Sequence, residues 1–279
     1  MKKITLAVLA IAAIGLIAAG MTGCAKAKET RLDSIKKTGK IILGTSADYP
    51  PYEFHAQIDG KDTVVGFDVA IAREVAKDLG VELEIKDMDF DGLLAALATG
   101  NVDMVIAGMT PNDERKKNVD FTDLYYFAEH GIMIRKADES KYAADIASLK
   151  DVVVGAQRGA IQVGLAKGKI KGVADDKLDA PHPQVKELAK LPDLVMELKN
   201  SKIEAVVAEL PVAKAYLTAN DDLMLATYTL MDADGGSAIA IRKGETALVA
   251  ELNKTIARLK SEGKIDAFVT EATETLGQY

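Results

Sequence analysis

Short apolar runs alternate with amphipathic stretches along the chain from Lys40 onward. The runs that predict strands are residues 40–44, 81–86, 102–107, 132–135, 152–156, 203–208 and 237–241. Apolar residues at helical spacing predict helices over 67–79, 90–99, 160–167, 182–191, 192–198 and 211–218, and a long final helix over 248–259. Strands that alternate with helices in this way indicate an α/β architecture.

One strand and the residues after it carry the most specific pattern. Val102–Ala107 is a nearly unbroken apolar run, typical of a strand buried on both faces, although a buried helix gives the same pattern. Gly108 ends the run, and Thr110 and Pro111 predict the N-cap and first residue of a helix. A helix N-terminus attracts anions, and Arg115, one turn further on, matches a carboxylate in bidentate fashion. The alternative is that the charged residues around Arg115 form only a solvated turn.

A second segment repeats this pattern. Residues 93–107 and residues 194–208 both predict a helix, a short turn and an apolar strand. Gly108 follows the first copy and Glu209 follows the second. Because ligands of open α/β sheets bind at the carboxyl ends of strands, two such units predict two similar lobes that face a shared cleft. The alternative is that any two αβ units look alike at this level, with Glu209 merely exposed at a strand end.

Composition and charge exclude several classes of function. The chain has 279 residues and a formal charge of −7, which argues against nucleic acid and favours cationic small ligands. His55, His130 and His182 are isolated, and Cys24 is the only cysteine, so neither a zinc site nor an intramolecular disulfide is expected. The sequence contains no HExxH motif, P-loop or GxSxG elbow. We therefore expect no metal, no cofactor and no enzymatic activity.

The first 23 residues predict a signal peptide of the lipoprotein type. Two lysines precede an apolar core over residues 4–19, and small residues follow it up to Cys24. The segment resembles a bacterial lipobox with Met21 in place of the usual leucine. Processing would leave Cys24 as a lipid (palmitate) acceptor that anchors the chain to a membrane, with residues 24–30 as lipidated cysteine and tether. The alternative is an ordinary signal peptide with an incidental thiol.

The remaining candidate side chains suit a zwitterion. Arg115 and the helix N-terminus would bind a carboxylate, and Glu209 would bind an ammonium group. Tyr49 and Phe90 would enclose an apolar or guanidinium stem. The alternative for Phe90 is packing in the core.

From about Lys40 to Tyr279 the chain resembles the extracellular solute-binding proteins, family 3, of polar amino-acid ABC transporters. The motifs that carry the resemblance are GTSADYPPYEF (44–54), VGFDVAIA (65–72), MDFDGLLAAL (88–97), VDMVIAGMTPNDERKKNVDFTDLYY (102–126), VVVGAQRGAIQ (152–162) and AVVAELPVA (205–213). The resemblance implies a type II periplasmic-binding-protein fold. Each lobe would be a mixed, mostly parallel sheet flanked by helices, with the ligand cleft between the lobes. Lobe 1 would comprise residues 31–127 and 236–279, and lobe 2 residues 128–235.

The resemblance also implies a function and roles for particular residues. The protein would bind a free polar amino acid outside the cytoplasmic membrane, as a monomer, and deliver it to an ABC permease and its ATPase. Arg115 would bind the ligand α-carboxylate, helped by Thr110 and the backbone N–H of Ile161. The α-ammonium would meet the Gly108 carbonyl, the Thr110 hydroxyl and Glu209. Lobe closure would be stabilised only because the ligand contacts both lobes.

The side-chain pocket indicates the class of amino acid. The positions that match pocket-lining residues of the family are Ser46, Tyr49, Phe90 and Gln157. This combination is more like that of arginine-binding members, so we expect a basic amino acid, arginine first. Asp48 and Glu53 would add negative potential, unless both are simply solvated.

Three departures and two alternatives accompany this resemblance. Glu209 stands where many relatives have Asp, Ala160 and Ile161 stand where many have Thr, and Ser46 stands where histidine- or glutamine-selective members often have Asp. The same fold hosts prephenate- or arogenate-dehydrating enzymes, in which Glu53 or Glu209 would have to donate a proton. A sensor that signals to a receptor is the other alternative.

Overall fold

The structure is a computed structural model that describes residues 29–231 and 235–276. The signal peptide and the lipid acceptor Cys24 lie outside the described residues. Residues from Arg31 onward form one compact unit. Among the described residues, none of the helices has the length and apolarity needed to cross a membrane.

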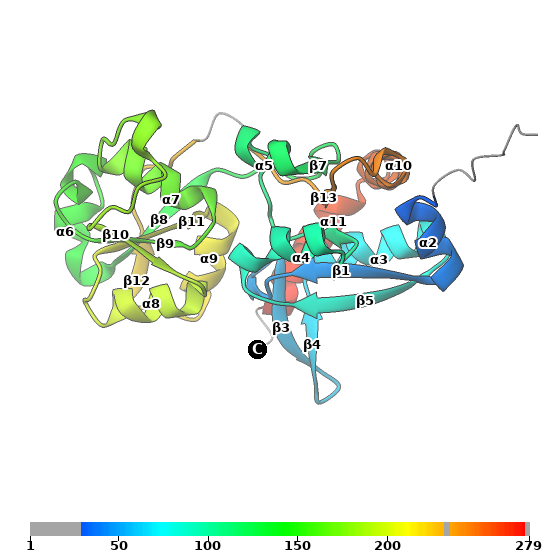
Figure 1. Cartoon of the computed structure of the whole chain (residues 1–279). Coiled ribbons are helices and arrows are strands. Elements are labelled where there is room, and N and C mark those ends of the chain that lie inside the picture. The colour runs from blue at the N-terminus through cyan, green and yellow to red at the C-terminus, as the bar shows by residue number, and fades with distance from the viewer. Residues whose placement is uncertain (1–28, 232–234, 277–279) are drawn as a thin grey trace, which may run out of the picture. The chain divides into compact units, whose positions relative to one another are not determined.

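The first of two five-stranded sheets has the strand order β5-β1-β6-β13-β7. Its strands are β1 (Lys40–Thr45), β5 (Glu82–Asp87), β6 (Met104–Val105), β7 (Val119–Phe121) and β13 (Ala240–Arg242). β1 runs parallel to β5 and β6, whereas β13 runs antiparallel to β6 and β7. The sheet is therefore mixed, and a strand from the end of the chain completes it (Figure 1).

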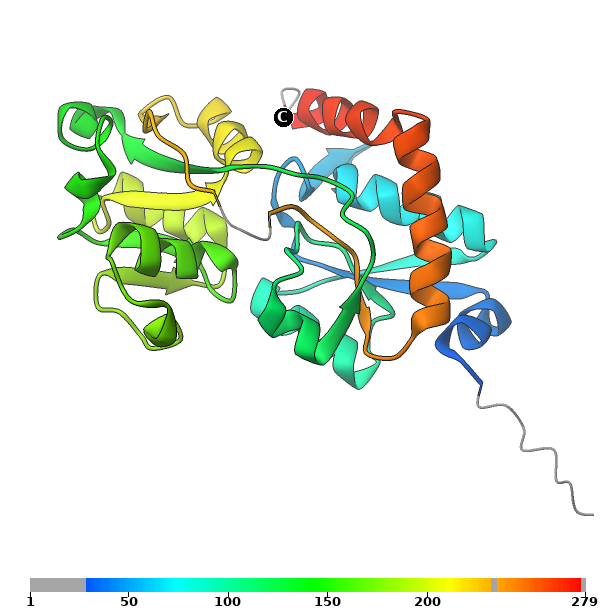
Figure 2. The same ribbon diagram turned by 90° about the horizontal axis from the view of Figure 1, so that it is seen from above.

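Helices and a small antiparallel sheet surround this first sheet. The helices are α2 (Arg31–Thr38), α3 (Phe67–Leu79), the 3₁₀ turn η1 (Phe90–Gly92), α4 (Leu93–Thr99), α5 (Asp113–Asn118), α10 (Thr246–Ser261) and α11 (Lys264–Leu276). The small sheet consists of β2 (Asp48–Tyr49), β3 (Glu53–Ile58) and β4 (Lys61–Val65). The apolar stripes of α3 and α10 are buried together in one core, and α3 also packs against α11 (Figure 2).

The second sheet has the strand order β10-β9-β11-β8-β12. Its strands are β8 (His130–Arg135), β9 (Val154–Gln157), β10 (Val185–Leu188), β11 (Ala205–Glu209) and β12 (Leu223–Leu225). Its helical segments are η2 (Lys136–Asp138), α6 (Glu139–Tyr142), η3 (Ile146–Leu149), α7 (Ile161–Leu165), the π-helix η4 (Ala166–Ile170), η5 (Asp175–Lys177), α8 (Leu191–Lys199) and α9 (Leu210–Thr218). β9 is parallel to β10 and β11, and β8 is antiparallel to β11 and β12.

Two chain segments connect the sheets, and they are paired with each other. Tyr125 N donates to Ser237 O, and Ser237 N donates to Tyr126 O, both at 2.8 Å. Gly236 allows this approach because its φ is +102° and a Cβ there would lie 2.8 Å from the Tyr126 carbonyl oxygen. The chain thus crosses between the sheets as a paired double connection.

The structure confirms the predicted α/β architecture and corrects two local predictions. Residues 182–191 do not form a helix, since β10 pairs in parallel with β9 there and Val185 is buried. The helix that carries Arg115 begins at Asp113 with Asn112 as its N-cap, two residues later than Thr110 and Pro111 predicted. The Asn112 side chain accepts a hydrogen bond from Arg115 N, which a threonine at 110 is too far back along the chain to do.

Candidate ligand-binding site

A hollow between the two sheets contains most of the predicted site. The residues that line it are Ser46, Asp48, Tyr49, Glu53, Phe90, Ala107, Gly108, Thr110, Arg115, Gln157, Ala160, Ile161 and Gln162. Every residue predicted to bind the ligand lines it except Glu209. Gln162 is an additional lining residue that the sequence reasoning did not single out, although it closes the motif at 152–162.

Among the described residues of this lining, Arg115 is the one arginine or lysine. Its guanidinium donates through Nη1 to Thr110 O at 2.8 Å and through Nη2 to Gly159 O at 2.9 Å, so it contacts groups beside both sheets. Its Cζ lies 5.4 Å from the centroid of the Phe90 ring. Burial lowers the pKa of Arg115 to about 10, which leaves the guanidinium charged at neutral pH. A buried cation in this position is suited to a carboxylate.

Asp48 is buried, which corrects the alternative that it is merely solvated. Its carboxylate accepts hydrogen bonds from Leu191 N at 2.9 Å, from Gln157 Nε2 at 3.2 Å and from Ser46 Oγ at 3.0 Å. Burial raises the pKa of Asp48, and these donors partly oppose that rise. Because Leu191 and Gln157 belong to the second sheet and its helices, Asp48 joins the two halves directly.

Glu209 lies behind the wall of the hollow, where two tyrosines hold it. Its Oε2 accepts a hydrogen bond from Tyr52 OH, and its backbone N donates to Tyr49 OH at 3.1 Å. Gln162 Nε2 also donates to Tyr49 OH, at 3.2 Å. The acid predicted at the end of this strand is therefore 4% exposed and is neither a surface residue nor a lining residue.

Two further carboxyl groups are buried beside Gly108. Asp68 accepts hydrogen bonds from Gly108 N and Tyr125 OH, both at 2.8 Å, and burial raises its pKa to about 6. Glu53 is fully buried, and burial together with the nearby Asp68 raises its pKa well above the usual range. The sequence reasoning missed Asp68, for which the only signal is its place at the start of an amphipathic helix within the motif at 65–72.

Several contacts join the two halves without any ligand atom. Besides the bonds of Asp48, Arg115, Tyr49 and Tyr52, Tyr216 OH donates to Asp48 O at 2.8 Å. Ion pairs link Lys190 to Asp89 at 3.2 Å and Arg158 to Asp91 at 3.5 Å. The expectation that only the ligand stabilises closure is therefore wrong, because protein groups contribute as well.

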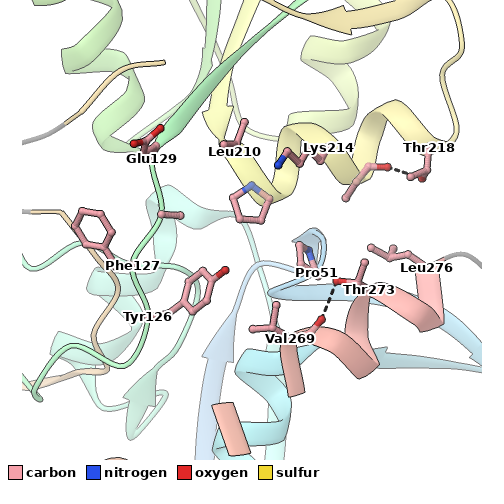
Figure 3. Close-up of a pocket in the computed structure, with 13 residues that line it drawn as sticks. Pro51, Tyr126, Phe127, Glu129, Leu210, Lys214, Thr218, Val269, Thr273 and Leu276 are labelled. Carbon is pink, nitrogen blue, oxygen red and sulfur yellow. Dashed lines mark hydrogen bonds between the residues drawn. The ribbon is translucent and has the colours of Figure 1, made fainter. Parts of the chain in front are cut away.

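A second hollow, of about 390 Å³, lies beside residues 126–129 (Figure 3). Residues of α9 and α11 form most of its wall, and Glu129 and Lys214 are the charged members of its described lining. No carboxylate and guanidinium converge there as they do around Arg115 and Asp48. The smaller hollow between the sheets is therefore the candidate ligand site. Elsewhere in the described ranges, no group of three His, Cys, Asp or Glu residues could hold a metal.

Known proteins resemble this chain over most of its length. Residues 41–272 match the family model of bacterial extracellular solute-binding proteins, family 3. The chain is 40% identical to the arginine-binding extracellular protein ArtP of Bacillus subtilis over 81% of this chain and 83% of that protein.

Solved structures show the same two-lobed type II fold. An amino acid ABC transporter substrate-binding protein of Streptococcus pneumoniae bound to L-arginine has a TM-score of 0.81 and 34% identity, over 88% of this chain and 98% of that one. The ancestral amino acid-binding protein AncCDT-1, described as a precursor of cyclohexadienyl dehydratase, has a TM-score of 0.74 and 30% identity, over 88% and 99%. The chain belongs to the bacterial extracellular solute-binding proteins of family 3.

Proposed function

We propose that this protein binds a basic amino acid, arginine first, for an ABC importer. The observation that carries the proposal is the imbalance of buried charge. The described lining contains one cation, Arg115, and two carboxyl groups, Asp48 and Glu53, while the buried Asp68 and Glu209 are hydrogen-bonded to the lining residues Gly108 and Tyr49. Burying unpaired charge is costly, so the best ligand brings more cation than anion. Arginine carries two cationic groups and one carboxylate.

The ends of the ligand would meet different parts of the site. Its α-carboxylate would bind the Arg115 guanidinium, with Thr110 and the Ile161 N–H as further donors. The α-ammonium would lie near the Gly108 carbonyl, the Thr110 hydroxyl and the acids on that side, which include Glu209 behind the wall. The high cost of an unpaired buried charge gives each contact a strong effect on affinity.

The side chain of the ligand would extend toward Asp48. Asp48, Ser46 and Gln157 are already joined by hydrogen bonds, and all three present oxygen atoms that accept from a guanidinium. Tyr49 and Phe90 would flank the stem. The arginine-binding relative of Bacillus subtilis and the arginine-bound structure from Streptococcus pneumoniae support this choice of side chain.

Family membership and the lipobox-like segment support a proposal for the wider biological role. We propose delivery of the amino acid to a membrane permease and its ATPase, by a monomer held outside the cytoplasmic membrane through lipid on Cys24. The lobes would be residues 31–127 with 236–279, and residues 128–235. The return of β13 to the first sheet supports the discontinuous lobe. A sensor role would use the same site with a different partner.

We propose no enzymatic activity. The likeness to AncCDT-1 makes dehydration of prephenate or arogenate the specific alternative. It would require Glu53 or Glu209 as a proton donor in a site whose Arg115 and Asp48 fit an amino acid. Direct assay for product from prephenate separates the two, because a binding protein forms none.

A thermal-shift screen of the purified protein against the twenty amino acids tests the proposed function. A ligand at a hundred times its dissociation constant adds about 2.7 kcal/mol to the unfolding free energy. We expect arginine to give the largest rise in melting temperature, followed by lysine. A larger rise with glutamine than with arginine, or no rise with any amino acid, would contradict the proposal.

A further inference from the structure

Glu53 is a buried acid whose hydrogen bonding is incomplete in the described part of the chain. Its side chain is fully buried and lines the hollow, yet neither of its carboxyl oxygens accepts a hydrogen from any group of the described residues. Oδ1 of the neighbouring Asp68 is likewise buried and has no hydrogen-bond partner among the described residues. A buried polar atom without a partner is costly, so these atoms require an explanation.

A single shared proton would satisfy two of these three atoms, one carboxyl oxygen of Glu53 and Oδ1 of Asp68. The Glu53 and Asp68 side chains are neighbours, and Asp68 raises the pKa of Glu53. Two carboxyl groups can form a hydrogen bond with each other only when one of them is protonated. Asp68 already accepts from Gly108 N and Tyr125 OH, both of which favour its ionised form. The proton therefore belongs on Glu53, which donates it to Asp68.

Other ionisable groups around Glu53 favour the same placement. Asp48 of β2 and Glu209 of β11 add negative charge toward it, and the tyrosines 49, 52 and 125 pack around these acids. Arg115, across the hollow, is occupied by two backbone carbonyls. If Glu53 were ionised beside an ionised Asp68, its negative charge would have no compensating cation among these groups.

We propose that Glu53 holds a proton shared with Asp68 in the free protein, and that the α-ammonium of the bound amino acid displaces it. The Glu53 O–H bond breaks, the proton passes to solvent, and the carboxylate accepts hydrogen bonds from the ammonium. Glu53 suits this role better than Glu209, because Glu53 lines the hollow whereas Glu209 accepts from Tyr52 behind the wall. The inference rests on the proposed function, since it needs an amino-acid ligand.

The sign of the pH dependence follows from this displacement. Binding releases a proton wherever free Glu53 is protonated and bound Glu53 is ionised, so affinity rises with pH by at most about tenfold per unit. The rise ends at the raised pKa of free Glu53, above which no proton remains to be released. The ligand guanidinium stays charged throughout this range, because its pKa lies far above it.

Calorimetry of arginine binding between pH 5 and 8, in two buffers of different ionisation heat, counts the protons released. The wild-type protein should release close to one proton at the lower pH values. Glu53→Gln should release almost none and bind about ten- to a hundredfold more weakly at pH 8, since it loses a charge-assisted contact. Glu82→Gln, an exposed acid on β5, is the matched control and should behave as wild type.

Wild-type binding without proton release at any pH in this range would overturn the inference, as would undiminished release by Glu53→Gln. A lack of arginine binding would instead contradict the proposed function. Infrared difference spectroscopy gives a second readout that needs no variant. The carbonyl stretch of a protonated carboxylic acid should disappear when arginine binds to the wild-type protein, and its absence before binding would also overturn the inference.

Discussion

At the scale of single residues, the two charged groups Arg115 and Asp48 are hydrogen-bonded to neutral partners. Arg115 uses two backbone carbonyls as acceptors, and Asp48 uses a backbone amide, an amide side chain and a hydroxyl. These bonds orient each charged group without neutralising it by an opposite full charge. A zwitterionic ligand can therefore bind to groups that are already positioned, which reduces the entropy lost on binding.

Replacement of Arg115 by alanine tests the assignment of the α-carboxylate. The variant would leave that carboxylate buried without a cation, at a cost of roughly 3 kcal/mol or more in binding free energy, on the order of a hundredfold in affinity. Isothermal titration with arginine measures the loss. Arg73→Ala, at an exposed position on α3, is the control and should bind normally. Near-native affinity of the Arg115 variant would disprove the assignment.

At the scale of elements, the helix containing Arg115 shows where sequence reasoning succeeds and where it stops. The short strand and the following helix were predictable from an apolar run and a helix-start signal. The start of α5 was not, because Thr110, Asn112 and Pro111 are all compatible with a helix start and the Asn112 side chain decides between them. Similarly, residues 182–191 have helical apolar spacing, yet pairing of β10 with β9 overrides that preference.

The cap on α5 gives a prediction about stability. Asn112→Ala removes the hydrogen bond from Arg115 N to Asn112 Oδ1 and should lower the unfolding free energy by about 1 kcal/mol. Urea denaturation followed by circular dichroism measures the change. Asn118→Ala, at the exposed last residue of the same helix, should change stability much less. Equal losses for the two variants would mean that the cap is not the stabilising contact.

At the scale of the whole molecule, the contacts between the two sheets depend on residues far apart in the sequence. Asp48 meets Leu191, and Tyr52 meets Glu209. No periodicity predicts such pairs, whereas the resemblance to family 3 predicted the lobes and most of the lining. Residue patterns predicted most strands of the two five-stranded sheets, but not β7, β10, β12 or the small sheet of β2, β3 and β4. They left the burial of Asp48 and Glu53 open, because burial depends on contacts between segments far apart in the sequence.

These contacts also bear on the opening and closing of the lobes. Protein groups on both sides already form hydrogen bonds, so the ligand needs to add only part of the free energy of closure. The excess of buried carboxyl groups then determines which ligand adds the most. A cationic side chain near Asp48 both offsets this negative charge and adds donors that contact both halves.

The most direct test compares arginine with citrulline, its neutral isostere, by titration calorimetry of the wild-type protein and of Asp48→Asn. Hydrogen bonds to charged groups contribute about 1.5–3 kcal/mol, so wild type should bind arginine at least about tenfold more tightly than citrulline. In Asp48→Asn, which retains an acceptor for Leu191 N, this ratio should fall toward one. Equal affinity of the wild-type protein for the two ligands, or a ratio unchanged by the substitution, would contradict a site built to hold a cationic side chain.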